Sequence, residues 1–110
     1  MASTRIERIA RNESAFRDLN ESLEQSVHRG RAESDYAGFV CECGDGDCEL
    51  TVRLELAAYE HIRRDPCLFL VVPGHELPEA EAVVEREENY FVVRKMEEAA
   101  DIVEQTDPRS

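Results

Sequence analysis

The chain has 110 residues and a mass of 12.5 kDa, enough for one domain with a single modest core. Its 25 acidic residues outnumber its 13 lysines and arginines, and the net charge of −12 disfavours binding to nucleic-acid phosphates and to anionic membranes. No apolar run is long enough to span a membrane, and residues 1–11 carry Arg and Glu where a signal peptide needs an apolar stretch, so we expect a cytoplasmic protein.

The first predicted element is an amphipathic helix over residues 5–28. Glu13, Arg17 and Glu21 stand four residues apart and predict ion pairs on one face of this helix. Apolar residues recur at the helical spacing and form one stripe: Ile6, Ile9, Phe16, Leu19, Leu23 and Val27. We expect the stripe to pack against the core. Docking on another chain is the alternative, because a polar connector over residues 29–38 separates the helix from the rest of the chain.

A β-hairpin and a short helix come after the connector. Apolar and polar residues alternate over residues 39–43 and again over residues 48–56, which is the period of a half-buried strand. The Gly-Asp-Gly-Asp loop at residues 44–47 predicts positive φ angles in a tight return. Residues 57–64 then form a short helix, which Pro66 ends.

The second half of the chain supplies the remaining strands. Residues 68–72 form a continuous apolar run, typical of a central, well-buried strand. Residues 82–87 and 90–95 predict a second hairpin. Residues 97–104 predict a final short helix, and residues 106–110 a frayed tail.

Together these elements predict an α+β fold. It consists of a small antiparallel β-sheet, built from two hairpins plus a central strand, with the N-terminal amphipathic helix and two short helices packed on it. We expect a single domain over residues 1–110. Residues 1–29 form its N-terminal helical arm, and residues 37–105 form its α+β core.

Three of the four cysteines lie close together in the sequence, as Cys41, Cys43 and Cys48. Because residues two apart on a strand point to the same face, the first two thiols project together, and Cys48 opens the returning strand nearby. Zinc takes four soft ligands in a tetrahedron, so three converging thiols predict a Zn²⁺ site. Buried cysteines acting as small apolar residues remain an alternative, and so does a disulfide, which a reducing compartment opposes.

The fourth ligand has three candidates. His75 follows Pro73-Gly74 at the end of the apolar strand, where a turn can aim the imidazole back at the hairpin. Cys67 competes with it, but it begins the same strand and is expected at the opposite end. His61 on the short helix is the third choice.

The nature of the site decides between two classes of function. A closed Cys3His set leaves no position for water, so we expect the zinc to contribute folding energy rather than catalysis. If His75 does not bind, one position stays open, and a zinc enzyme or a metal- or redox-responsive protein becomes the alternative. No catalytic triad, phosphate-binding loop or pair of catalytic carboxylates is recognised.

The acidic residues outside the cysteine cluster are expected at the surface. Glu42 alternates with its cysteine neighbours, so the strand pattern places it on the opposite face, as a surface residue rather than a general base. A run of glutamates predicts a solvated face, with docking of a basic partner as the alternative: Glu79, Glu81, Glu85, Glu87 and Glu88.

Two segments carry a family resemblance: F-V-C-E-C-G at residues 39–44, followed by Cys48, and P-G-H-E at residues 73–76. With further matches along nearly the whole chain, they resemble a family of small uncharacterised proteins of high-GC Gram-positive bacteria. The resemblance implies that Cys41, Cys43, Cys48 and His75 are the shared set. It implies that Cys67 lies outside that set, and it implies no reaction.

We therefore expect a small acidic zinc-binding domain with a structural Cys3His site. It would be non-catalytic and would act as an interaction or regulatory module whose partner is another protein. The N-terminal helix and the acidic surface would be its docking surfaces. The chain would be a monomer, or a homo-oligomer formed through the helix.

Overall fold

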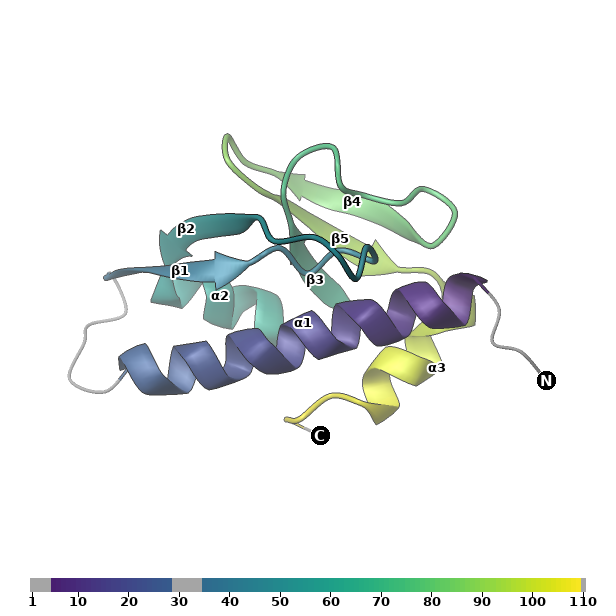
Figure 1. The fold of residues 1–110 in the computed structure, drawn as a ribbon, viewed down its shortest axis with the longest axis horizontal. Coiled ribbons are helices and arrows are strands. Elements are labelled where there is room, and N and C mark those ends of the chain that lie inside the picture. Colours follow the sequence, from purple (N-terminus) through teal and green to yellow (C-terminus); the bar gives the residue numbers. More distant parts are fainter. Residues whose placement is uncertain (1–4, 29–34, 110) are drawn as a thin grey trace.

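The computed structural model describes residues 5–28 and 35–109, and it has the expected α+β class (Figure 1). None of the described helices is long and apolar enough to cross a membrane. The elements follow one another as α1 (Arg5–His28), β1 (Tyr36–Val40), β2 (Thr51–Glu55), α2 (Leu56–Arg63), β3 (Leu68–Val71), β4 (Glu81–Arg86), β5 (Phe91–Lys95) and α3 (Glu97–Gln105).

The strands form two small antiparallel sheets. One pairs β1 with β2, and the other has the order β3-β5-β4. β5 is therefore the middle strand of its sheet, whereas β3, which was expected to be central, is an edge strand with all four residues buried. The chain after β1 covers that edge, because the Glu42 N–H donates to the Leu70 carbonyl at 2.7 Å. This contact joins the two sheets beside the cysteines.

The cysteines lie in a loop rather than on the strands. β1 runs from Tyr36 to Val40, so it begins inside the predicted connector and ends before Cys41. β2 begins only at Thr51 and is shorter than the alternation predicts. The expected positive φ angles are absent from the loop, because Gly74 is the one glycine with positive φ among those described. Asp45 closes the loop instead. Its carbonyl accepts from the Cys48 N–H at 3.0 Å, and its carboxylate accepts from the Asp47 N–H at 2.9 Å.

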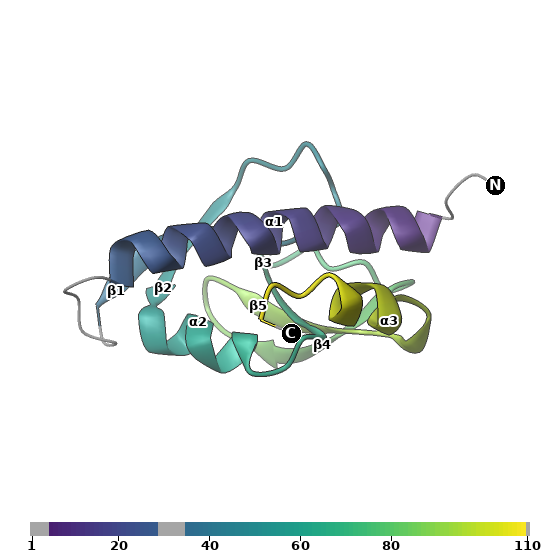
Figure 2. The same ribbon diagram turned by 90° about the horizontal axis from the view of Figure 1, so that it is seen from below.

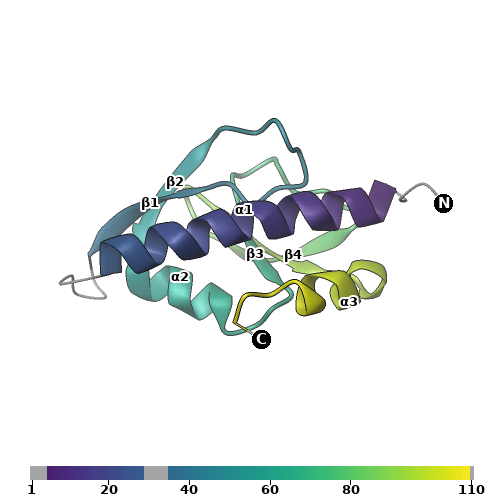
Figure 3. The same cartoon turned by 60° about the horizontal axis from the view of Figure 1, so that its bottom comes forward.

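Helix α1 lies lengthwise along the molecule, with α2 beside its C-terminal half and α3 beside its N-terminal half (Figures 2 and 3). Its apolar stripe does not form the main contact, since Leu19 is 47% exposed and Phe16 and Leu23 are half-buried. The side chain of Val27 lies outside the described residues. The buried face is mostly polar and consists of Ile9, Ala10, Glu13, Ser14, Arg17, Asn20, Glu21 and Glu24.

This polar face is buried because distant parts of the chain supply partners for it. Arg17 donates to the carbonyls of Pro66 at 2.6 Å and Val103 at 2.7 Å, and its guanidinium lies over the Phe69 ring. Asn20 donates to the Val40 carbonyl and accepts from the Val40 N–H, both at 2.8 Å. The prediction that the apolar stripe is the packing face is therefore wrong for most of the helix.

Buried ion pairs tie the ends of the chain to its centre. Lys95 pairs with Glu13 of α1 and with Glu81 of β4, so Glu81 is not on a solvated face. Arg63 of α2 pairs with Glu21 and, at 2.5 Å, with Asp107. Because Asp107 is buried in this pair, the chain after α3 is packed in place, and the prediction of a frayed tail is wrong for residues 106–109.

The apolar core has two parts. The first lies between the β1–β2 sheet and α2, where the rings of Phe39 and Tyr59 stack with centroids 4.3 Å apart. The second surrounds Phe69 and includes the buried thiols of Cys41 and Cys43. The cysteine loop therefore packs against the second part of the core.

Candidate metal centre

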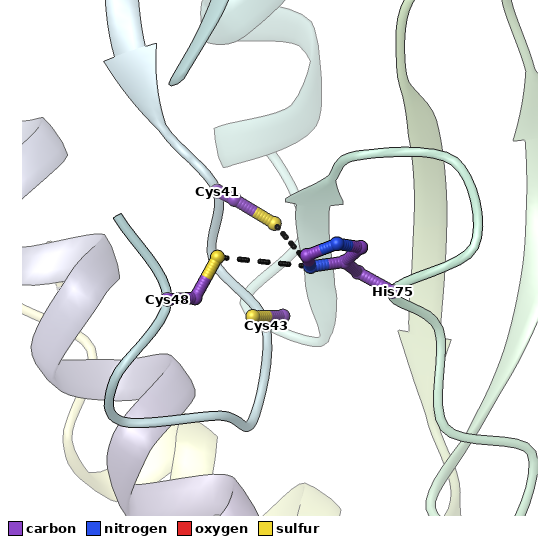
Figure 4. A group of neighbouring side chains, drawn as sticks. All are labelled: Cys41, Cys43, Cys48 and His75. Atoms are coloured by element: carbon purple, nitrogen blue, oxygen red, sulfur yellow. Dashed lines mark hydrogen bonds between the residues drawn. The ribbon is translucent and has the colours of Figure 1, made fainter. Parts of the chain in front are cut away.

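The cysteine loop and the turn after β3 bring four donor side chains to one place. The thiols of Cys41, Cys43 and Cys48 and the imidazole of His75 point toward a common centre (Figure 4). Their four ligand atoms all lie within 4.8 Å of one another. These are the four residues that the sequence predicts as the set.

Two of the distances between the donor atoms match those around a tetrahedral zinc ion. With Zn–S bonds of about 2.3 Å and a Zn–N bond of about 2.0 to 2.1 Å, a sulfur and a nitrogen on the same zinc are about 3.6 Å apart. His75 Nδ1 lies 3.6 Å from Cys48 Sγ and 3.8 Å from Cys41 Sγ. The donor set and its spacing therefore fit a metal bound through Nδ1 of the imidazole.

The turn after β3 explains why the histidine faces the thiols. The His75 N–H donates to the Val72 carbonyl at 2.9 Å, and Gly74 has φ of 94°. Pro at the second position and a positive φ at the third are the signature of a type II turn. A side chain at residue 74 would be strained in this conformation, so the Pro-Gly pair is what reverses the chain and directs His75.

Burial and hydrogen bonding differ among the thiols. Cys41 and Cys43 are buried, and Cys41 Sγ accepts from the Val72 N–H at 3.2 Å. Cys48 and His75 are half-buried and form the outer side of the cluster. The hydrogen bond from Cys41 lowers the pKa of Cys43 to about 5, while burial raises the pKa of Cys48. A thiolate, the form that binds metals, is therefore favoured at Cys43.

Helix α1 holds the loop from the other side. The Asn12 side chain donates to the Gly44 carbonyl at 2.8 Å. A Cβ at residue 44 would lie 2.6 Å from Ile9 Cγ2 and 2.9 Å from Leu77 Cδ1, so glycine is required for the helix to approach this closely. The close packing of α1 on the loop therefore depends on the glycine at position 44, directly after Cys43.

Glu42, between the first two cysteines, is fully buried, and its expected place on the surface is wrong. Its carboxylate accepts hydrogen bonds from Tyr59 Oη at 2.7 Å, from Asn20 Nδ2 at 2.8 Å and from the Leu70 N–H at 3.0 Å. Burial raises the pKa of Glu42, and these donors oppose that shift. The strand alternation used in the prediction ends before this residue, so no local pattern could have revealed its burial.

The two competing fourth ligands lie elsewhere. Cys67 is buried at the start of β3, where its thiol donates to Glu104 at 3.4 Å and burial raises its pKa to about 11. His61 is 56% exposed and contacts Glu85 at 3.3 Å. Neither belongs to the cluster of four. All four cysteines are free of disulfide bonds.

The arrangement can hold one soft metal ion with four protein donors. Comparisons of the chain with protein-family models, with curated proteins and with solved structures give no match. The assignment of a function therefore depends on the chemistry and the position of this cluster.

Proposed function

We propose that this protein is a zinc-binding α+β domain in which Cys41, Cys43, Cys48 and His75 form a closed structural site. The observation that carries the proposal is the convergence of three thiols and one imidazole within 4.8 Å. Among biological metals, zinc combines a preference for thiolate and imidazole with a tetrahedral geometry. Four protein donors would give the ion a complete coordination shell.

The position of the cluster supports a structural role. It joins the loop after β1 to the turn after β3, and these segments belong to different sheets. An ion there would cross-link the two sheets beside α1. Four protein ligands leave no position for a substrate or a reactive water, so the zinc would supply folding free energy rather than catalysis.

With its metal in a structural role, the domain would act through its surface. The net charge of −12 suits a cationic partner and opposes nucleic acids and anionic membranes. We therefore assign the chain a non-catalytic role as a cytoplasmic interaction or regulatory module, with another protein as its partner.

The proposal is tested by metal content and stability measured together. The protein is purified without added metal, and bound metal is identified and counted by native and inductively coupled plasma mass spectrometry. We expect one zinc per chain. Replacing any of the four residues, for example His75→Ala, should abolish tight binding and unfold the domain, since zinc binding and folding are coupled in small sites.

Two variants serve as matched controls. Cys67→Ala removes a thiol and His61→Ala removes an imidazole outside the cluster, and both should retain one zinc. If His75→Ala remains folded with zinc bound, the site has an open position, and the metal- or redox-responsive function or the zinc enzyme replaces the structural one. A wild-type chain that folds without any metal would refute the proposal.

A further inference from the structure

A groove of about 440 Å³ lies outside the metal centre, between the β1–β2 sheet and the turn that connects β4 and β5. Its size falls within the range of about 300 to 1,000 Å³ that is typical of ligand sites. Tyr36 and residues 53–55 of β2 line one side, and residues 87–90 line the other. In Figure 1 this turn stands above β2.

Main-chain and side-chain hydrogen bonds hold the two walls. The Glu87 N–H donates to the Tyr90 carbonyl at 2.9 Å, which closes the turn. Asn89 Nδ2 donates to the Arg53 carbonyl at 2.9 Å, which ties the turn to β2. The groove is therefore formed before any ligand arrives, and a preformed site lowers the entropy cost of binding.

The lining combines aromatic rings with an excess of negative charge. Glu55, Glu87 and Glu88 supply three carboxylates, against the single guanidinium of Arg53. Burial raises the pKa of Tyr90, and the carboxylates of Glu87, Glu85 and Glu55 raise it further. The Tyr90 hydroxyl thus lies in a negative field.

The glutamates of the acidic run are not equivalent. Glu81 is buried against Lys95, Glu79 pairs with Arg5 and Glu85 contacts His61. Within the described part of the chain, Glu87 and Glu88 have no such cation, and both line the groove. Of the five glutamates in this run, the two without such a cation therefore lie together at the groove.

We propose that the groove binds an arginine side chain from a basic segment of a partner protein. Tyr36 is 49% exposed and already holds the guanidinium of Arg53 at 5.9 Å from its ring centroid. A guanidinium stacks on such rings and forms paired hydrogen bonds with carboxylates, which a lysine ammonium does not. Ala58, which is half-buried at the groove, supplies an apolar surface that suits the methylene stem. This inference deepens the proposed interaction module and depends on it.

The test is an NMR titration of the full, metal-loaded, ¹⁵N-labelled chain with a capped Gly-Arg-Arg-Gly peptide at low ionic strength. We expect saturable shifts confined to the amides of residue 36, residues 53–58 and residues 87–90. The Gly-Lys-Lys-Gly peptide should bind several-fold more weakly, and Gly-Gln-Gln-Gly should not bind. Because zinc content is measured on the same sample, failure of peptide binding is distinguished from failure of the metal site.

Two double variants separate a specific groove from general attraction. Glu87→Gln with Glu88→Gln should weaken arginine-peptide binding at least tenfold. Asp18→Asn with Asp101→Asn removes the same charge from exposed positions on α1 and α3 and should weaken binding less than twofold. Tyr36→Leu should cost about fivefold or more without unfolding the chain. Shifts spread over the acidic surface, equal losses in the two double variants, or no shifts with zinc bound would each overturn the proposal.

Discussion

One cluster of ionisable side chains is buried in the interior of this small domain. Glu13, Glu81 and Lys95 are all buried and in contact with one another. Two ionised carboxylates beside one ammonium would leave a net negative charge in the interior, which is costly. Burial, reinforced by the hydrogen bond to Glu81, raises the pKa of Glu13 to about 10. Glu13 therefore keeps its proton at neutral pH, which removes one negative charge from the cluster.

The retained proton predicts how stability changes with pH. The unfolded chain releases this proton near pH 4.5 and the folded chain near pH 10, so the folded state binds more protons between these values. Stability from this group must then fall as pH rises through that window, by at most about 1.4 kcal/mol per pH unit. Glu13→Gln keeps the neutral form and should remove this fall. Urea unfolding of the wild type and of Glu13→Gln at pH 6, 7.5 and 9 measures this fall. If the free energies of unfolding of the two proteins change in parallel with pH, Glu13 is ionised in the folded state.

The main relation between elements is the contact of α1 with the cysteine loop. Asn12 holds the Gly44 carbonyl, Asn20 holds both polar groups of Val40, and Glu42 accepts from Asn20 as well. The helix thus binds the loop on both sides of the first two cysteines. We therefore expect docking of α1 and assembly of the candidate metal centre to be coupled through these bonds.

A methyl group added at the contact tests this coupling. In Gly44→Ala the new Cβ would lie 2.6 Å from Ile9 Cγ2, so the helix or the loop must move. We expect a loss of stability of about 1 to 3 kcal/mol, as overpacking typically costs, together with weaker retention of metal against a chelator. Gly46→Ala is the matched control, because its Cβ would meet Asn12 at an ordinary 3.5 Å. Chemical unfolding of both variants measures the difference, and equal stabilities would contradict the close approach of α1.

At the scale of the whole molecule, Leu19 is the one strongly exposed large apolar side chain among the described residues of the α1 stripe. Ile9 of the stripe is buried, Ile6, Phe16 and Leu23 are half-buried, and Leu19 is exposed. The other large exposed apolar residues lie on separate segments: Tyr36, Leu50, Val84 and Met96. Stable homodimers bury at least about 1,200 Å² of total surface, with an apolar centre.

The sequence left open a monomer or a homo-oligomer formed through the helix, and we predict a monomer in solution. Size-exclusion chromatography with light scattering at micromolar concentration should give a mass near the 12.5 kDa of the single chain. A dimer that Leu19→Gln converts to a monomer would instead support assembly through the helix. The same substitution should leave the stability of a monomer almost unchanged, because its side chain is largely in solvent.

Local sequence patterns predicted most of the secondary structure and the four residues of the candidate site. The period of 3.6 located α1, alternation located the hairpins, and the Pro73-Gly74 turn directed attention to His75. The cysteine spacing correctly predicted that the thiols gather, although they lie in a loop and not on strands. A closed loop brings neighbouring thiols together as well as a strand does. Strand ends and loop closure were less accurate, since an Asp45 turn replaced the expected glycine conformations.

By itself, then, the sequence determined the order of the elements and the four side chains that gather beside β1 and β3, because turns and periodicities depend on near neighbours. The tertiary structure alone decided which face of α1 is buried and where Glu42 lies. It alone also formed the groove between the β1–β2 sheet and the turn that connects β4 and β5. Burying a polar side chain is costly unless other groups satisfy it, and those groups can be distant in the sequence. For Arg17 these groups are carbonyls 49 and 86 residues away, which no local pattern can identify.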